Sequence, residues 1–168
     1  HYFDACVDDS RLVLRTIQDG MLHHGEALNY AKVTDFVKSK NGEVIGVLVA
    51  DQSGILSPEM QEIQGNVVVN ASGPWSDIVR EGIKGTPKLR KLRGSHLIFS
   101  HEKLPIKQAL TMIHPKDHRA LFAIPWEGTT IIGTTDLDQK EMNSEPRISS
   151  EEIEYLLQAT RFAFPAIT

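Results

Sequence analysis

The sequence predicts an α+β fold in two lobes. The first, over residues 1–88, is of α/β type, and the second, over residues 89–168, is built on an antiparallel sheet. The α/β lobe is indicated by the Val-rich run 66–70, which is followed by Gly73-Pro74 and a helical pattern. This is the order of strand, turn and helix that an α/β lobe contains. Four short β-rich runs separated by turn residues indicate the lobe with the antiparallel sheet. A chain of 168 residues can bury a core of this size.

The first lobe is expected to begin with a helix and continue with short strands. Asp8-Asp9-Ser10 has the residues of a helix N-cap, and apolar residues then recur at helical spacing up to Leu22, before Gly25. Asn41-Gly42 predicts a tight hairpin turn. We expect strands at residues 27–31, 33–37 and 44–50, a loop at 52–65, a strand buried on both faces at 66–70, and a helix with Trp75, Ile78, Val79 and Ile83 on its inner face.

The second lobe is expected to form an antiparallel sheet closed by a helix. Ser149 and Glu152 have the spacing of a capping box, in which each side chain bonds the other's backbone N–H. Apolar residues at helical spacing follow them. The four strand candidates are residues 95–100, 109–113, 119–124 and 129–133.

Composition narrows the function classes. The net charge of −4, with no run of five like charges, argues against a nucleic-acid partner. A single cysteine, Cys6, excludes an internal disulfide and fits a reducing compartment. The apolar stretch 46–50 is too short to span a bilayer. The start at His1 has neither a Met nor the pattern of a signal peptide, and is expected to be a cut inside a longer protein.

Three places in the chain have residues that suit chemistry. Ala71-Ser72-Gly73, at the end of the expected buried strand, would let the phosphates or ribose of a cofactor approach the backbone, or would simply make a tight turn. A neutral His96 could accept a hydroxyl proton while hydride leaves the same carbon, or could be a histidine satisfied in the core. Residues 133–136 could orient a polyol or phosphate, or cap a turn. Arg119 could face an anion or lie on the surface.

Other chemistries have no support in the sequence. There is no Ser-His-Asp order, no Cys-x-x-Cys and no His-Glu-x-x-His, so neither a hydrolase nor a zinc site is expected, and no metal ligand is assigned. The histidines in polar, turn-like contexts are expected at the surface; they are His101, His114 and His118.

Several short motifs follow one another over nearly the whole chain. They are Asp4, Asp8-Asp-Ser-Arg-Leu12, Gly25 with Asn29-Tyr30, Val69-Asn-Ala-Ser-Gly-Pro-Trp75, Arg93-Gly-Ser-His96, Arg119, Ile124-Pro-Trp126 and Ile131-Ile-Gly-Thr-Thr-Asp136. Their joint order resembles the flavin-linked glycerol-3-phosphate dehydrogenases, members of the D-amino-acid-oxidase-like superfamily.

This resemblance implies a reaction and a set of roles. Hydride would pass from C2 of sn-glycerol 3-phosphate to FAD, giving dihydroxyacetone phosphate, and the electrons would go on to a membrane quinone. His96 would face the substrate hydroxyl as the base, and Thr134 and Arg119 would bind the substrate. The residues implied to line FAD are Val33, Ala71, Ser72, Gly73 and Trp75. The flavin would do the redox chemistry and the protein would bind and orient.

The sequence departs from the family at both ends of the pattern. The glycine-rich G-x-G-x-x-G turn that holds the FAD pyrophosphate is absent, as are the arginine segments that bind the substrate phosphate. We therefore expect an incomplete FAD lobe that neither holds FAD tightly nor turns over alone, and that self-associates through its exposed face. The alternatives are a glycerophosphate oxidase, a 2-hydroxyacid dehydrogenase, or a β-rich interaction module. The parent protein is expected to be cytoplasmic, peripheral on the inner face of the membrane.

Overall fold

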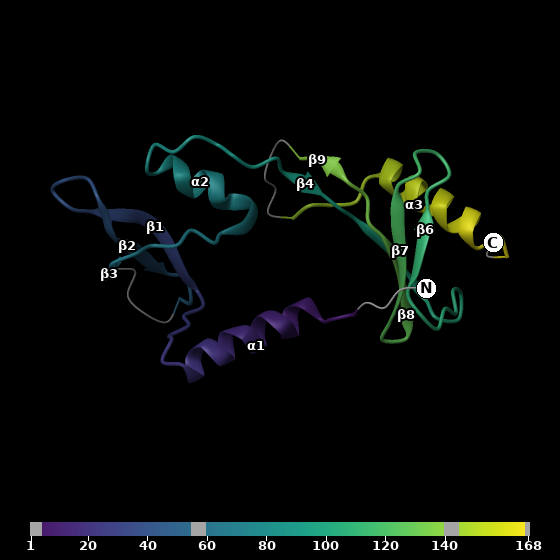
Figure 1. Ribbon diagram of the computed structural model, residues 1–168, viewed down its shortest axis with the longest axis horizontal. Helices are drawn as coiled ribbons and strands as arrows, with labels where there is room; N and C mark the ends of the chain where they lie inside the picture. The colour runs from purple at the N-terminus through teal and green to yellow at the C-terminus, as the bar shows by residue number, and fades with distance from the viewer. Residues whose placement is uncertain (1–4, 55–59, 140–144, 167–168) are drawn as a thin grey trace. The chain divides into compact units, whose positions relative to one another are not determined.

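The computed structural model describes residues 5–54, 60–139 and 145–166 (Figure 1). Asp4, which belongs to the motif pattern above, lies outside these residues. The chain divides into two compact units, one made of residues 1–71 and 79–85 and the other of residues 72–78 and 86–168. Each unit is described by itself below.

Helix α1 (Asp9–Leu22) opens the first unit and is capped as its sequence predicts. The side chain of Asp8 accepts a hydrogen bond from the backbone N–H of Arg11 at 3.0 Å, which satisfies one of the free donors of the first turn. The helix ends before Gly25, whose N–H bonds the carbonyl of Gly20 at 2.9 Å. No residue of α1 is buried.

An antiparallel sheet follows, in the order β1 (Ala31–Lys38), β2 (Val44–Asp51) and β3 (Gln61–Gln64). The hairpin at Asn41-Gly42 is confirmed, because Gly42 has a φ of 84°, which glycine adopts without strain. Two expectations are wrong: residues 27–30 form no strand, because β1 begins only at Ala31, and the expected loop at 52–65 contains β3. Residues 55–59 of that loop lie outside the described ranges.

The expected buried strand at residues 66–70 does not form. Val67 and Val69 are 78% and 79% exposed, and no strand in the described ranges pairs with this segment. A Val-rich strand of a parallel sheet needs hydrogen-bonded neighbours and covered faces, and neither is present here. A 3₁₀ turn (Gly73–Trp75) and helix α2 (Ser76–Glu81) come next, as expected, but the apolar residues predicted for an inner face are largely exposed.

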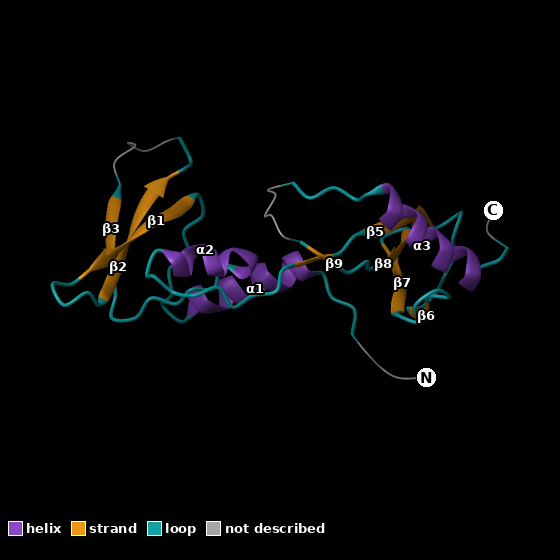
Figure 2. Ribbon diagram, turned by 90° about the horizontal axis from the view of Figure 1, so that it is seen from above, coloured by secondary structure: helices purple, strands orange, loops and turns teal. Residues whose placement is uncertain are grey.

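The second unit contains the predicted antiparallel sheet, in the order β5 (His96–Ser100), β8 (Thr129–Gly133), β7 (Ala120–Trp126) and β6 (Leu110–Ile113). All four strands were expected within a few residues. A two-stranded pair, β4 (Leu92–Arg93) with β9 (Leu137–Asp138), was not. Figure 2 shows the same elements from above, with strands in orange.

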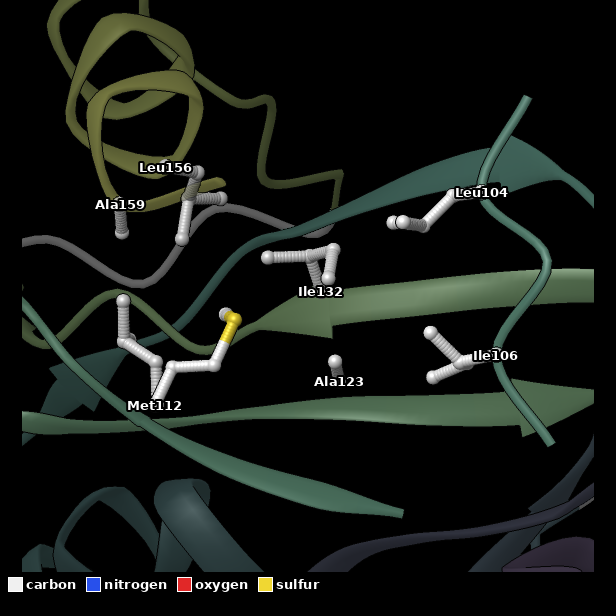
Figure 3. Close-up of a cluster of buried hydrophobic side chains, with 8 residues drawn as sticks. Leu104, Ile106, Met112, Ala123, Ile132, Leu156 and Ala159 are labelled. Carbon is white, nitrogen blue, oxygen red and sulfur yellow. The ribbon is translucent and has the colours of Figure 1, made fainter. Parts of the chain in front are cut away.

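Helix α3 (Ser150–Ala163) packs on this sheet through contacts with β5, β6 and β8. Its capping box is confirmed, with both reciprocal bonds between Ser149 and Glu152 formed. Leu156 and Ala159 point from the helix toward Met112 and Ile132 of the sheet (Figure 3). None of the helices in the described ranges is long and apolar enough to cross a membrane.

His114 corrects another expectation, because its side chain is fully buried instead of lying at the surface. Its Nδ1 accepts the N–H of Lys116 at 3.0 Å, so its Nε2 carries the hydrogen and donates to the carbonyl of Tyr155 at 3.1 Å. The imidazole also stacks on the Tyr155 ring, with centroids 3.8 Å apart. A histidine whose two nitrogens are both bonded can be buried without a large desolvation penalty. His101 and His118 are exposed, as expected.

Candidate active site

His96 is the first residue of β5 and lies directly across from Gly133, the last residue of β8. A Cβ atom on Gly133 would overlap the His96 imidazole, which therefore packs against the backbone of residue 133. His96 is exposed, and no hydrogen bond of its imidazole is found within the described part of the chain. The glycine thus provides a surface on which the ring rests, and the exposed side chain is accessible to a ligand.

Thr134 follows Gly133, and its side chain packs against a second glycine, Gly94. A Cβ on Gly94 would overlap the Thr134 hydroxyl and lie 2.9 Å from the carbonyl of Thr135, so only glycine allows the two segments to come this close. The Thr134 hydroxyl donates to the Thr135 carbonyl at 3.0 Å, which leaves its lone pairs able to accept. The structure therefore brings His96 and Thr134 to the same end of the sheet.

A buried carboxylate lies behind this end of the sheet. Glu152 is 2% exposed. Its Oε1 accepts from the hydroxyls of Ser95, at 2.8 Å, and Thr135, at 2.7 Å. Its Oε2 accepts from Nη2 of Arg93, at 2.5 Å, and from the N–H of Ser149, at 2.8 Å. Every non-local donor in this set belongs to a segment that carries His96 or Thr134.

The charge of Glu152 is stabilised by these donors. Burial by itself raises the pKa of this carboxyl group, but the hydrogen bonds from Ser149, Thr135 and Ser95 and the charge of Arg93 act in the opposite direction. The net effect is a pKa below the usual value for glutamate. The side chain is therefore an ionised acceptor at neutral pH, although it is almost wholly removed from water.

Arg119 lies just before β7, away from the segments that carry His96 and Thr134 in the sequence. Its guanidinium approaches the carboxylate of Asp136 at 3.6 Å, and it lines a groove of about 610 Å³ whose walls include Thr135 and Tyr155. Neither His96 nor Thr134 is among the described residues that line this groove. The structure therefore places Arg119 beside Asp136, two residues after Thr134, and shows no contact of its guanidinium with His96 or Thr134 among the described residues.

The residues expected to line a flavin fall in both units and are accessible in each. Val33 of β1 and Ala71 belong to the first unit, and both are exposed. In the second unit, Gly73 has a φ of 56°, and a Cβ there would meet no other described atom within 4 Å. A left-handed glycine with free space beside it lets a phosphate or ribose approach the backbone, which fits a nucleotide cofactor. Ser72 is half-buried, and Trp75 beside it offers an exposed ring.

One part of this site could not be expected from sequence motifs. The roles of Gly94 and Gly133 depend on which residue faces each of them across the sheet, and that register exists only in the folded chain. The nearest signals in the sequence are Gly94, two residues before His96, and Gly133, immediately before Thr134.

The chain belongs to the family of FAD-dependent oxidoreductases, whose family model matches residues 1–168. Aerobic glycerol-3-phosphate dehydrogenases of Staphylococcus aureus strains USA300 and MRSA252 are each 36% identical to it over 169 aligned positions, which cover 99% of this chain and 30% of theirs. The structure of the glycerol-3-phosphate dehydrogenase from Bacillus halodurans complexed with FAD matches it with a TM-score of 0.85 and 35% identity. That match covers 95% of this chain and 32% of the other.

The comparisons confirm the family that the motifs resemble, the D-amino-acid-oxidase-like α+β fold and FAD as the cofactor of that family. The chain spans about a third of the length of the relatives that it matches.

We predict that the ionised Glu152 makes the stability of the second unit depend on pH. Because the pKa of Glu152 is lowered in the folded state, its contribution is complete above the unfolded-state pKa and is lost as the pH falls through the folded-state pKa. Urea unfolding at several pH values should therefore show stability falling on acidification, and Glu152→Gln should make this fall shallower. Glu154→Gln, an exposed position of the same helix, is the matched control and should keep the wild-type dependence. An unchanged dependence in Glu152→Gln would contradict the prediction.

Proposed function

We propose that the protein containing this chain oxidises sn-glycerol 3-phosphate to dihydroxyacetone phosphate, with FAD as the hydride acceptor. The observation that carries the proposal is the exposed His96 imidazole, which rests on Gly133, the residue that directly precedes Thr134. The relatives named above, which are glycerol-3-phosphate dehydrogenases, support this substrate.

In this reaction His96 accepts the proton of the substrate's C2 hydroxyl as the C2–H bond breaks and its hydrogen leaves as hydride. The C–O bond becomes a carbonyl, so one proton and one hydride account for the two hydrogens that are removed. Thr134, whose hydroxyl can still accept a hydrogen bond, orients a substrate hydroxyl beside the imidazole. Both side chains come from the ends of paired strands, which restrict their motion.

The flavin, when bound, supplies the hydride-accepting chemistry that no side chain of this chain can provide. Val33, Ala71, Ser72, Gly73 and Trp75 are the residues that we expect to hold it. Arg119 remains a predicted substrate-binding residue. We expect the chain by itself to bind FAD weakly and not to turn over, which a fluorescence titration with FAD would measure.

We predict that His96→Asn removes the proton acceptor and leaves the cofactor in place. In the full-length flavoenzyme that carries this sequence, anaerobic reduction of the flavin by glycerol 3-phosphate should slow by about 10²–10⁴-fold, the usual contribution of a positioned acid or base. Stopped-flow absorbance measures this rate, and the ratio of flavin to protein shows that the cofactor remains bound. His101→Asn, at an exposed turn of the same unit, is the control and should reduce flavin at the wild-type rate. Equal rates in His96→Asn and wild type would rule out His96 as the base.

The second proposal concerns the electron acceptor, which we take to be a membrane quinone. The alternative in the same superfamily is an oxidase, in which oxygen is reduced to peroxide. Turnover of the full-length enzyme in air should therefore require an added quinone and release little peroxide. Stoichiometric peroxide without quinone would identify an oxidase, and turnover of a 2-hydroxyacid in place of glycerol 3-phosphate would change the substrate class.

Location and assembly stay predictions as well. A quinone-linked enzyme is expected to be cytoplasmic and peripheral on the inner face of the membrane, which fractionation with a high-salt wash would test. Exposed large apolar side chains such as Leu28, Val67 and Val69 support self-association of the isolated chain, which sedimentation would measure.

A further inference from the structure

Within the described residues, four groups bind the Glu152 carboxylate, and they come from three parts of the chain. One is the backbone of Ser149, in the cap of α3. The others are the side chains of Arg93 and Ser95, in and beside β4 and β5, and that of Thr135, after β8. Ser95 directly precedes His96, and Thr135 directly follows Thr134. The carboxylate is therefore bonded one residue away from each of the two side chains proposed to meet the substrate.

We infer that Glu152 is a positioning residue, whose buried carboxylate fixes the strand ends that hold His96 and Thr134 in their places. The inference rests on the proposed function for the roles of His96 and Thr134. The hydrogen bonds of Glu152 explain how the strand ends are held. Glu152 does not act as an acid or base itself, because it is 2% exposed and both of its oxygens are occupied by donors.

The hydroxyl of Thr135 makes the connection between the two segments. It donates to Glu152 Oε1 at 2.7 Å and accepts the backbone N–H of Ser95 at 2.8 Å. The N–H of Thr135 in turn bonds the carbonyl of Ser95 at 3.2 Å. These bonds continue the pairing of β5 with β8 beyond the pair of His96 with Gly133, where the regular ladder ends. Without the hydroxyl, the Ser95 N–H and one carboxylate oxygen would each lose a partner.

Small displacements of these segments would change the positions of His96 and Thr134. Gly94 and Gly133 allow contacts so close that one added carbon atom would overlap Thr134 or the His96 ring. A shift of either segment therefore has to move the imidazole relative to the Thr134 hydroxyl. Misplacement of a catalytic group by about 1 Å can cost on the order of 10²-fold in rate.

The first test follows His96 itself and needs no substrate. The imidazole signals of His96, assigned by their absence in His96→Asn, are recorded by NMR in this chain and in Glu152→Gln, Thr135→Val and Thr135→Ser. Glu152→Gln and Thr135→Val should move or broaden the His96 signals, whereas Thr135→Ser, which keeps the hydroxyl, should leave them near their wild-type positions. The matched control is Thr130→Val, which removes a buried hydroxyl of β8 that donates to the carbonyl of Leu104 at 2.7 Å, and it should leave the His96 signals unchanged.

The second test uses the flavin-loaded full-length enzyme. Thr135→Val should lower kcat by about tenfold or more with a smaller change in KM, because the base is misplaced in the bound complex. Thr135→Ser should restore kcat, and Thr130→Val, at a comparable cost in stability, should retain it. A purely structural role would instead give Thr135→Val and Thr130→Val the same kcat.

The outcomes separate this inference from the proposed function. In one outcome, the His96 signals of this chain move in the variants while the full-length enzyme fails to oxidise glycerol 3-phosphate. That result would overturn the proposed function and keep the positioning role of Glu152. Unmoved signals in folded Glu152→Gln and Thr135→Val would overturn the positioning role, whatever the enzyme oxidises. If Thr135→Val does not fold, Ser95→Ala, at a half-buried position with one hydroxyl bond to Glu152, decides in the same way.

Discussion

The candidate site depends on one buried carboxylate and its four donors. A carboxylate removed from water is costly unless each oxygen is bonded, and Glu152 meets that condition with two hydroxyls, a guanidinium and a backbone N–H. The Arg93 guanidinium, 21% exposed, also donates to the carbonyl of Arg147 at 2.9 Å, so the ion pair is itself tied to the chain before α3. Loss of any donor would leave a charged, buried group short of a partner, which is why these segments hold one arrangement.

Two glycines allow the restrained segments to approach each other closely enough to form the candidate site. Gly133 lets the His96 ring lie on the backbone of β8, and Gly94 lets the Thr134 hydroxyl approach the segment before β5. The absence of two side chains brings an imidazole and a hydroxyl together at one end of the sheet, while the core of Leu121, Ile132 and Leu156 supports that sheet from the side of α3. Packing, hydrogen bonding and the proposed chemistry therefore concern the same few residues.

The second unit was predictable because its elements carry local signals. Strands separated by turn residues and a capping box at Ser149 and Glu152 are read within a few positions of the chain. The run 66–70 was predicted wrongly because its character as a strand depends on neighbouring strands. The burial of His114 and Glu152 could not be predicted from the sequence for the same reason. Both polar side chains are buried because they bond residues that are distant in the sequence. His96 and Thr134 were found through a family pattern, whereas the contacts that hold them needed the fold.

The most direct measurement is amide hydrogen exchange at Ser95 and Thr135, whose N–H groups join the two segments beside the carboxylate. If Glu152 holds the strand ends together, both amides in this chain should be protected to a degree approaching that of Ile132, a buried residue of β8. Glu152→Gln should then reduce their protection by about tenfold or more while that of Ile132 changes less. Unprotected amides in the wild type, or equal protection in Glu152→Gln, would contradict the central role of the carboxylate.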